Sequence, residues 1–193
     1  GAGEASIAFF ESKGYPKEAV LDYLIMLADS GFERWRSKNT STRLSKYPLD
    51  LGAFQTGGGP IFDFEKLNYI SREFIAKLDA SEVLKRGLLW SKKHDTALYN
   101  LVNSNTKYAC QALGIERGGN NVRKDMINWS ALRGELSYFF DDIFALTKPD
   151  ALAMIAFMNE AEISFFLRDY LEVYDCKDDR EIWVGKREGV WLG

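Results

Sequence analysis

The chain has 193 residues, of which 46% are hydrophobic and 14% aromatic, so it is globular rather than disordered and can bury a sizeable core. Its 25 basic and 28 acidic side chains nearly balance, so the whole chain lacks the strong positive charge typical of many nucleic-acid binders. No apolar run approaches the roughly 20 residues that a membrane-spanning helix needs.

A signal peptide is not expected at the start of the sequence. Gly1-Ala2-Gly3 has no basic region and no cleavage pattern, which argues against a signal peptide. Cys110 and Cys176 lie far apart and fit neither a disulfide framework nor the spacing of a metal site. We therefore expect a cytoplasmic protein that does not bind to membranes.

Helical periodicity dominates the first half of the chain. Apolar residues at i, i+3 and i+4 spacing predict helices over residues 4–13, 16–28 and 63–78. Gly14 suits the left-handed cap that ends the first helix, and Pro16 suits the first turn of the second. Asp63 can cap the third. Between the second and third, residues 57–60 (GGGP) predict a turn.

The second half of the chain shows the same pattern. Ser81 signals a helix through Leu89, and Asp95 can cap another that continues to residue 113. Residues 114–121, rich in glycine and asparagine, interrupt the pattern. The apolar spacing over residues 132–144 predicts a further helix, and Pro149 is expected to open the last long one. We predict an all-α protein with a division near residue 80.

Charge is distributed unevenly along this helical chain. Residues 85–133 carry nine basic and three acidic side chains, whereas residues 134–193 carry six and thirteen. A polyanion would meet the local basic block and not the overall sum. The alternative is a solvated face on which charges cluster by chance.

The most informative part of this block is residues 117–125 (RGGNNVRKD), a stretch of flexible residues with three cations. Arg117, Arg123 and Lys124 suit contacts to phosphate and base edges. The neighbouring aromatic residues that suit stacking on unpaired bases are Trp129, Tyr108 and Trp90. The alternative interpretation is a surface loop, with Trp129 anchoring a helix in the core.

Signs of an active site are weak. His94, the only histidine, has no nucleophile nearby in sequence and is best interpreted as an exposed residue at a helix end. The acidic pairs 141–142 and 178–179 point in different directions on a helix, so they favour a solvated face over a metal site. Residues 57–60 lack the Lys-Ser/Thr pair of a phosphate-binding loop.

Several spaced segments resemble bacterial glutamyl-tRNA synthetases of class I. Residues 4–10 (EASIAFF) and 14–24 (GYPKEAVLDYL) resemble the family segment that follows the KMSKS-type lysine loop and enters a helical stem-contact domain. Residues 59–68 (GPIFDFEKLN) are similar to the family's FD-x-x-KL-x signature. Residues 116–130 (ERGGNNVRKDMINWS) and 171–183 (LEVYDCKDDREIW) resemble a clostridial-type branch.

The departures from the family pattern concern catalysis. The HIGH signature and the KMSKS-type loop are both absent, so the chain is expected to lack the ATP site and adenylate chemistry. Residues 43–46 (RLSK) only superficially echo the lysine loop. The family pattern is also lost from Trp183 onward, where we expect the last anticodon-domain helices to be missing. The chain alone is expected to have no catalytic residues and no cofactor, with ATP and magnesium serving the parent enzyme.

The resemblance implies that the chain binds tRNA(Glu) through two domains. We expect no DNA or membrane partner. Residues 4–80 would form the stem-contact connector, and residues 81–193 a helical anticodon-binding domain, truncated at its C-terminus. From charge and position we predict these RNA-facing side chains: Arg117, Arg123, Lys124, Lys107, Arg133, and, in the connector, Arg36 and Lys38.

Two alternatives stay open. A helical protein-interaction module would use the basic block to dock an acidic partner, without preference for tRNA over other polyanions. A class I lysyl-tRNA synthetase would share a related helical architecture, although the FD-x-x-KL match favours glutamate.

Overall fold

The computed structural model describes residues 6–40, 42–49, 52, 62–118, 122–144, 158–175, 177 and 180–192. These residues form helices, turns and loops without a β-strand, which confirms the all-α prediction. The chain divides into two compact units, residues 1–144 and residues 145–193. Within the described ranges, no helix has the length and apolar character required to cross a membrane.

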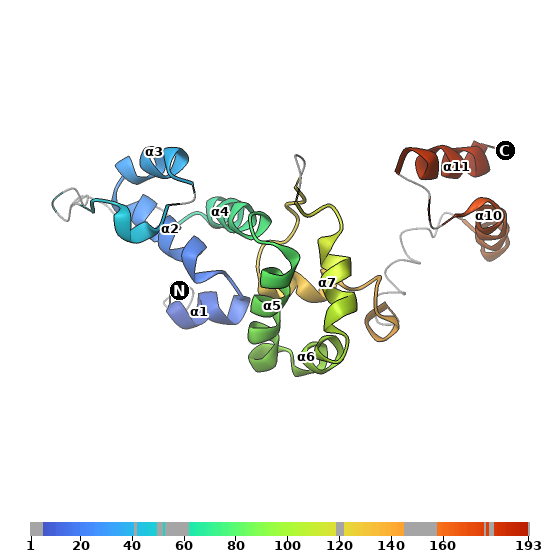
Figure 1. The fold of residues 1–193 in the computed structure, drawn as a ribbon, viewed down its shortest axis with the longest axis horizontal. Helices are drawn as coiled ribbons and strands as arrows, with labels where there is room; N and C mark the ends of the chain where they lie inside the picture. The colour runs from blue at the N-terminus through green and yellow to red at the C-terminus, as the bar shows by residue number, and fades with distance from the viewer. Residues whose placement is uncertain are drawn as a thin grey trace. The chain divides into compact units, whose positions relative to one another are not determined.

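The first unit begins with a group of short helices (Figure 1), and some of them pack together around a small core. Its elements are α1 (Ile7–Lys13), α2 (Lys17–Ala28), α3 (Gly31–Lys38), the 3-10 helix η1 (Leu44–Lys46) and α4 (Phe64–Ala76). Helix α2 packs along α4, and the buried side chains of the core are Phe10, Ala19, Tyr23, Leu67 and Ile70. The Asp63 carboxylate accepts hydrogen bonds from two amides of α4, as its capping position predicts. The turn expected at residues 57–60 lies outside the described residues.

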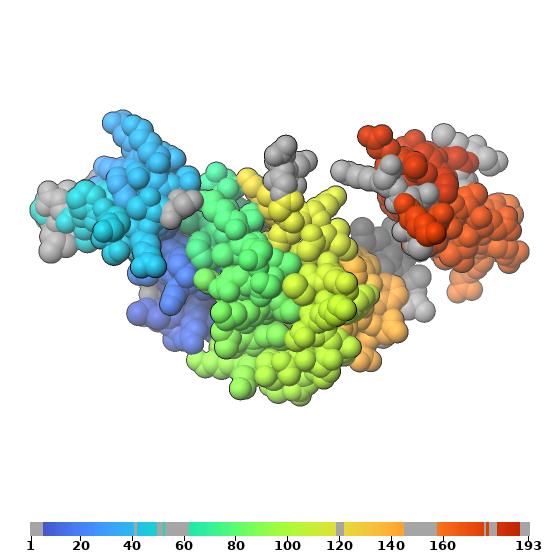
Figure 2. Space-filling view, in the orientation of Figure 1, coloured from blue at the N-terminus to red at the C-terminus, as the bar shows by residue number. Residues whose placement is uncertain are grey.

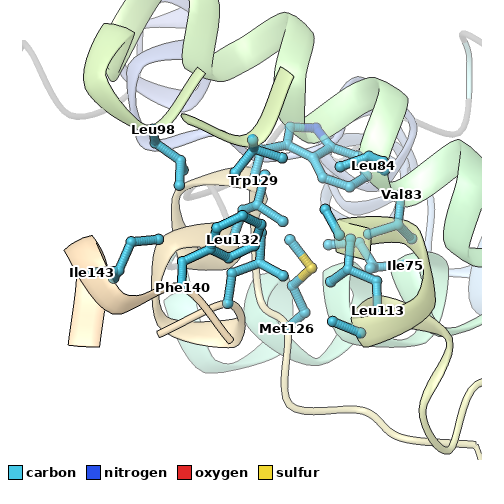
Figure 3. Close-up of a cluster of buried hydrophobic side chains, with 14 residues drawn as sticks. Ile75, Val83, Leu84, Leu98, Leu113, Met126, Trp129, Leu132, Phe140 and Ile143 are labelled. Atoms are coloured by element: carbon cyan, nitrogen blue, oxygen red, sulfur yellow. The ribbon is translucent and has the colours of Figure 1, made fainter. Parts of the chain in front are cut away.

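A larger core lies among α5 (Ala80–His94), α6 (Thr96–Asn103), α7 (Thr106–Gly114) and the segment that follows them. Figure 3 shows side chains of the three helices around Met126, Trp129 and Leu132. Trp129 starts the 3-10 helix η3 (Trp129–Ala131) and is only 7% exposed. It therefore anchors the core, as the structural interpretation of this residue predicted, and its ring is not available for stacking on a base.

Backbone contacts join these two cores at the end of α1. Gly14 has a left-handed conformation with φ of 78°, as predicted for a cap, and its carbonyl accepts a hydrogen bond from the Trp129 amide at 2.8 Å. The Trp90 indole donates to the Glu11 carbonyl at 3.0 Å. A Cβ atom at Gly14 would lie 2.9 Å from the Ser130 amide nitrogen, so only glycine permits this close approach.

The division expected near residue 80 falls between α4 and α5, inside the first compact unit. The helix after it starts at Ala80, where Asp79 accepts a hydrogen bond from the Glu82 amide at 2.8 Å. Ser81, the predicted start signal, instead donates its hydroxyl to Asp79. The ranges 4–80 and 81–193 stay a prediction about functional parts.

The continuous helix predicted over residues 132–144 is wrong. After α8 (Leu132–Glu135) the chain turns at residues 136–139 and is helical again at 141–144. The Ser137 hydroxyl donates to the Gly134 carbonyl at 2.7 Å, a local bond that competes with helical pairing. The turn still buries Leu136, Phe140 and Ile143, so the apolar pattern correctly marked core residues.

The second unit contains two packed helices, α10 (Glu160–Val173) and α11 (Arg180–Leu192). Asn159 caps α10 in a reciprocal arrangement, in which its side chain accepts from the Glu162 amide and Glu162 accepts from the Asn159 amide. The predicted start at Pro149 lies outside the described residues. Among the side chains described here none is buried, and Phe165 and Leu171 are largely exposed.

Candidate nucleic-acid interface

The two connector cations predicted to face RNA lie on α3 and differ in their surroundings. The Arg36 guanidinium forms an ion pair with Asp22, donates to the Thr42 carbonyl at 2.7 Å and lies over the Trp35 ring. It is mostly buried and holds α2 and α3 together. Lys38 is the exposed last residue of α3, and it makes no ion pair with a described residue.

Arg117 has an internal role in the described structure. Its Nη1 donates to the Ile75 carbonyl at 3.0 Å and to the Leu78 carbonyl at 3.4 Å, and its Nε donates to the Leu113 carbonyl at 3.1 Å. These carbonyls lie at the C-terminal ends of α4 and α7, where a cation is stabilising. Burial lowers the pKa of Arg117, but an arginine remains charged at neutral pH.

The neighbouring cations Arg123 and Lys124 are paired with carboxylates. Arg123 contacts both Asp125 and Glu135 at 2.6 Å, and Lys124 contacts Glu73 of α4 at 2.6 Å. Burial raises the pKa of Glu135, although the charge of Arg123 acts in the opposite direction. The segment after α7 is therefore tied to α4 and α8 by charge pairs.

The remaining two predicted cations lie apart from this cluster. Arg133 donates two hydrogen bonds to Asp95, which also caps α6 as predicted. The single helix predicted from Asp95 to residue 113 is wrong, because the chain is divided there into α6 and α7. Lys107, on the first turn of α7, is exposed and makes no ion pair with any residue in the described ranges. Thus five of the seven predicted cations have internal partners, whereas Lys38 and Lys107 make no ion pair with a residue that the structure describes.

A hollow of about 570 Å³, here named the α5–α7 groove, lies beside Lys107. Figure 2 shows α5 in green and α7 in yellow-green side by side, as their packing requires. Its described lining contains no carboxylate and consists of three kinds of residue. The lysines are Lys85, Lys92 and Lys107, the apolar residues include Leu84, Leu88 and Leu89, and Tyr99, Asn103, Thr106 and Cys110 lie between them.

The three groove lysines are largely available to a ligand. Lys85 is 70% exposed and 3.5 Å from Glu82, but that carboxylate pairs more closely with Arg86 at 2.6 Å. The Lys92 ammonium lies 5.9 Å from the centre of the Tyr99 ring. Since an exposed ion pair contributes little, an anion can replace the weak contact of Lys85 at small cost.

Sequence reasoning included Lys107 but missed Lys85 and Lys92. A signal was present, because Lys85, Leu88, Leu89 and Lys92 follow i, i+3, i+4 and i+7 spacing and so share one helix face. Lys85 and Lys92 lie at the two ends of this face, with Leu88 and Leu89 between them. Leu89 is 65% exposed. Such a stripe, basic at both ends and apolar between, indicates a ligand-binding face more than a core face.

A second hollow of similar volume differs from the α5–α7 groove in the charges of its lining. The hollow between α2, α3 and α4 has nearly the same volume, about 560 Å³, but four carboxylates line it: Glu18, Asp22, Glu33 and Glu73. The same lining also holds three cations, Arg36, Arg43 and Lys77, so its charges are close to balanced, whereas the charged side chains that line the α5–α7 groove are all lysines. A polyanion is therefore attracted to the α5–α7 groove rather than to this hollow.

Other side chains that suggested chemistry have structural surroundings. His94 lies exposed at the end of α5 and stacks on Trp90 with ring centres 5.2 Å apart, which agrees with the helix-end interpretation. Asp141 and Asp142 are exposed. The described residues contain no cluster of three or more potential metal ligands. Tyr108 is 48% exposed and packs edge-on against Phe140.

Comparison with known proteins relates the chain to the aminoacyl-tRNA ligases. The chain is 34% identical over 183 residues to a glutamate–tRNA ligase of Sorangium cellulosum, covering 95% of the chain and 32% of the relative. It is 31% identical over 185 residues to that of Acetivibrio thermocellus and 28% identical over 192 residues to that of Clostridium perfringens strain 13. These matches cover 95% and 98% of the chain, but 33% and 35% of the relatives.

By these similarities the chain belongs to the glutamate–tRNA ligase family, which confirms the resemblance inferred from its motifs. It spans about a third of the length of the curated relatives that it matches. No protein-family profile and no solved structure matches the chain.

Proposed function

We propose that the chain is the tRNA-binding part of a glutamate–tRNA ligase, which positions tRNA(Glu) and reads its anticodon for ATP-dependent glutamylation by a catalytic domain. The similarity to glutamate–tRNA ligases over 95% of the chain is the observation that carries this proposal. ATP and magnesium would serve the catalytic domain of the parent enzyme, and we propose no cofactor for the present chain. The site of action would be the cytoplasm, where bacterial tRNAs are charged.

Within this proposal, residues 4–80 contact the inner side of the tRNA and residues 81–193 contact the anticodon arm. The α5–α7 groove supports the second assignment, because three lysines without a carboxylate among its described lining suit a phosphate backbone. Of the predicted contacts, Lys107 and Lys38 are exposed without an ion pair to a described residue. Arg36, Arg117, Arg123, Lys124 and Arg133 would have to share their hydrogen bonds with RNA.

Binding to purified RNA tests this proposal. Filter binding of the full chain is measured with transcripts of tRNA(Glu), tRNA(Gln) and tRNA(Lys), and with heparin as a non-nucleic polyanion. We expect tRNA(Glu) to bind more tightly than tRNA(Lys), with an affinity that falls steeply between 50 and 200 mM salt, on the order of ten-fold or more. Because heparin shares the charge but not the shape of tRNA, it should compete weakly.

Two results would contradict the proposal. Equal affinity for tRNA and heparin would favour the protein-interaction module with a basic docking surface. A preference for tRNA(Lys) over tRNA(Glu) would favour a lysine-type synthetase, which the similarity to glutamate–tRNA ligases does not support.

A further inference from the structure

We propose that the α5–α7 groove holds an unpaired nucleotide of a single-stranded RNA segment, with its base against Tyr99 and the apolar floor and its flanking phosphates on the lysines. This inference rests on the proposed function and names the part of the RNA that the groove takes. Of the seven cations predicted from the sequence, only Lys107 lines the groove.

The shape of the groove suits a base more than a continuous backbone. Its volume of about 570 Å³ is within the range of small-molecule sites, on the order of 300–1,000 Å³. Leu84 and Leu88 form an apolar floor, and Leu84 is nearly buried. An apolar surface of this kind favours the face of a base, because contact with the leucines removes the base from water.

Charge is placed around the floor, where phosphates on either side of a base would lie. Lys85 and Lys92 are on α5, two helical turns apart, and Lys107 is across the groove on α7. A spacing of seven residues on a helix corresponds to about 10.5 Å. The lysines therefore flank the floor on both sides, an arrangement that suits the repeated charges of a nucleic-acid strand.

Tyr99, which lines the groove, supplies the stacking surface. Its ring is half-buried, and the Lys92 ammonium lies 5.9 Å from the ring centre. A base stacked on this ring would lie beside a cation that also contacts the phosphate. Aromatic stacking contributes to binding of unpaired bases, whereas the bases of an A-form duplex are stacked inside the helix.

The chemistry of the groove distinguishes this ligand from an acidic peptide. Both would be attracted by the lysines, but only the nucleotide gains from the ring of Tyr99 through base stacking. The two ligands therefore respond differently to removal of the ring. This difference is the basis of the test.

Cys110 provides a direct readout, because its thiol lines the groove and is half-buried. The full chain with Cys176→Ser leaves Cys110 as the only thiol in the sequence. Its alkylation by N-ethylmaleimide is followed with hexauridylate, with an RNA duplex of equal phosphate number, or with hexaglutamate. We expect hexauridylate to slow alkylation by at least five-fold at saturation and the duplex to slow it by less than two-fold.

Matched variants test the ring and the charges separately. Tyr99→Phe keeps the ring and should bind hexauridylate as the parent does, whereas Tyr99→Leu should bind about ten-fold more weakly. Lys177→Ala removes an exposed lysine of the other unit and should have no effect. Circular dichroism and thermal melting establish that each variant is folded before binding is measured.

The outcomes separate this inference from the proposed function. If tRNA(Glu) binds but neither hexauridylate protects Cys110 nor Tyr99→Leu weakens binding, the nucleotide site is refuted and the proposed function stands. Stronger protection by hexaglutamate than by hexauridylate also refutes it and favours a peptide. If tRNA(Glu) itself does not bind, both proposals fail.

Discussion

The guanidinium of Arg133 donates two hydrogen bonds to the carboxylate of Asp95, from Nε at 2.8 Å and from Nη2 at 2.6 Å. Asp95 also accepts from the Leu98 amide and so caps α6. The two residues are 38 positions apart, so the pair fixes the start of α6 against α8. A cation that the sequence suggested for RNA is thus part of the fold.

We expect Arg133→Ala to reduce the free energy of unfolding by about 1–2 kcal/mol at pH 7, because two charge-assisted bonds are lost at a partly exposed site. The hydrogen bond from Arg133 lowers the pKa of Asp95. The stabilisation by this ion pair is therefore fully present above the pKa of Asp95 in the unfolded chain, about 3.9. It is lost as the pH falls through the pKa of Asp95 in the folded protein. Urea unfolding at pH 7 and pH 3 should show a deficit at pH 7 that shrinks at pH 3.

Asp95→Asn is the matched control for this pair, because it removes the charge but keeps an oxygen that can accept from the Leu98 amide. It should lose less stability than Asp95→Ala. A deficit in Arg133→Ala that stays the same at both pH values would show that the ion pair with Asp95 does not stabilise the fold.

A second prediction concerns Arg123 and the buried carboxylate that it contacts. Glu135 has a side chain only 15% exposed, and Arg123 is its ion-pair partner at 2.6 Å. Without this partner the carboxylate is left largely buried, so Arg123→Ala should cost about 2–4 kcal/mol of unfolding free energy at pH 8. The double variant with Glu135→Gln should recover part of this loss, because it removes the uncompensated charge.

The pH dependence of this variant follows from the pKa of Glu135, which burial raises. A folded pKa above the unfolded value of about 4.3 means that the folded state binds the proton more tightly, so stability falls as pH rises between the two values. Removing Arg123 raises the folded pKa further. Chemical denaturation should therefore show a larger deficit at pH 8 than at pH 5, and an equal deficit would contradict this account.

Gly14 gives a third prediction, with Gly118 as its natural control. Both glycines have positive φ, 78° and 85°, so alanine at either costs about 1–2 kcal/mol in backbone conformation. At Gly14 the new Cβ would also lie 2.9 Å from the Ser130 amide and 3.1 Å from the Trp129 amide, whereas at Gly118 it meets nothing within 4 Å. Gly14→Ala should therefore lower the melting temperature clearly more than Gly118→Ala.

Equal losses in these two alanine variants would show that the contact between α1 and η3 tolerates displacement. A larger loss at Gly14 would show that this contact holds the two cores of the first unit together. Gly134→Ala serves as a further reference, because its Cβ meets nothing within 4 Å and its φ is not positive.

Local signals explain how much of the fold the sequence predicted. The caps at Gly14, Asp63 and Asp95 depend on residues a few positions away, and all three were correctly placed. The prediction of one helix over residues 132–144 was wrong, because apolar spacing cannot distinguish a continuous helix from a turn that buries the same side chains. Serine side chains form such bonds inside helices as well as in turns, so Ser137 alone did not indicate the turn.

The candidate site was less predictable because it depends on pairing over long sequence separations. Arg117 reaches carbonyls 39 and 42 residues away, and Lys124 reaches Glu73 across 51 residues. No local pattern reveals that such a cation already has a partner. The groove lysines on α5 were visible as a helix face, but their proximity to Lys107 requires knowing that α5 packs against α7.

The last prediction compares the exposed Lys107 with the paired cations Arg123 and Lys124 in binding to tRNA(Glu). The logarithm of affinity falls linearly with the logarithm of salt, and each phosphate contact contributes about one to the slope. Lys107→Ala should reduce the slope by about one, because its charge is not shared with a described carboxylate. Arg123→Ala with Lys124→Ala should reduce it by less than one per side chain, because RNA would have to replace Glu135 and Glu73 as partners. Filter binding between 50 and 200 mM salt gives both slopes. A slope unchanged by Lys107→Ala but reduced by about two in the double variant would move the RNA interface from the α5–α7 groove to the segment that follows α7.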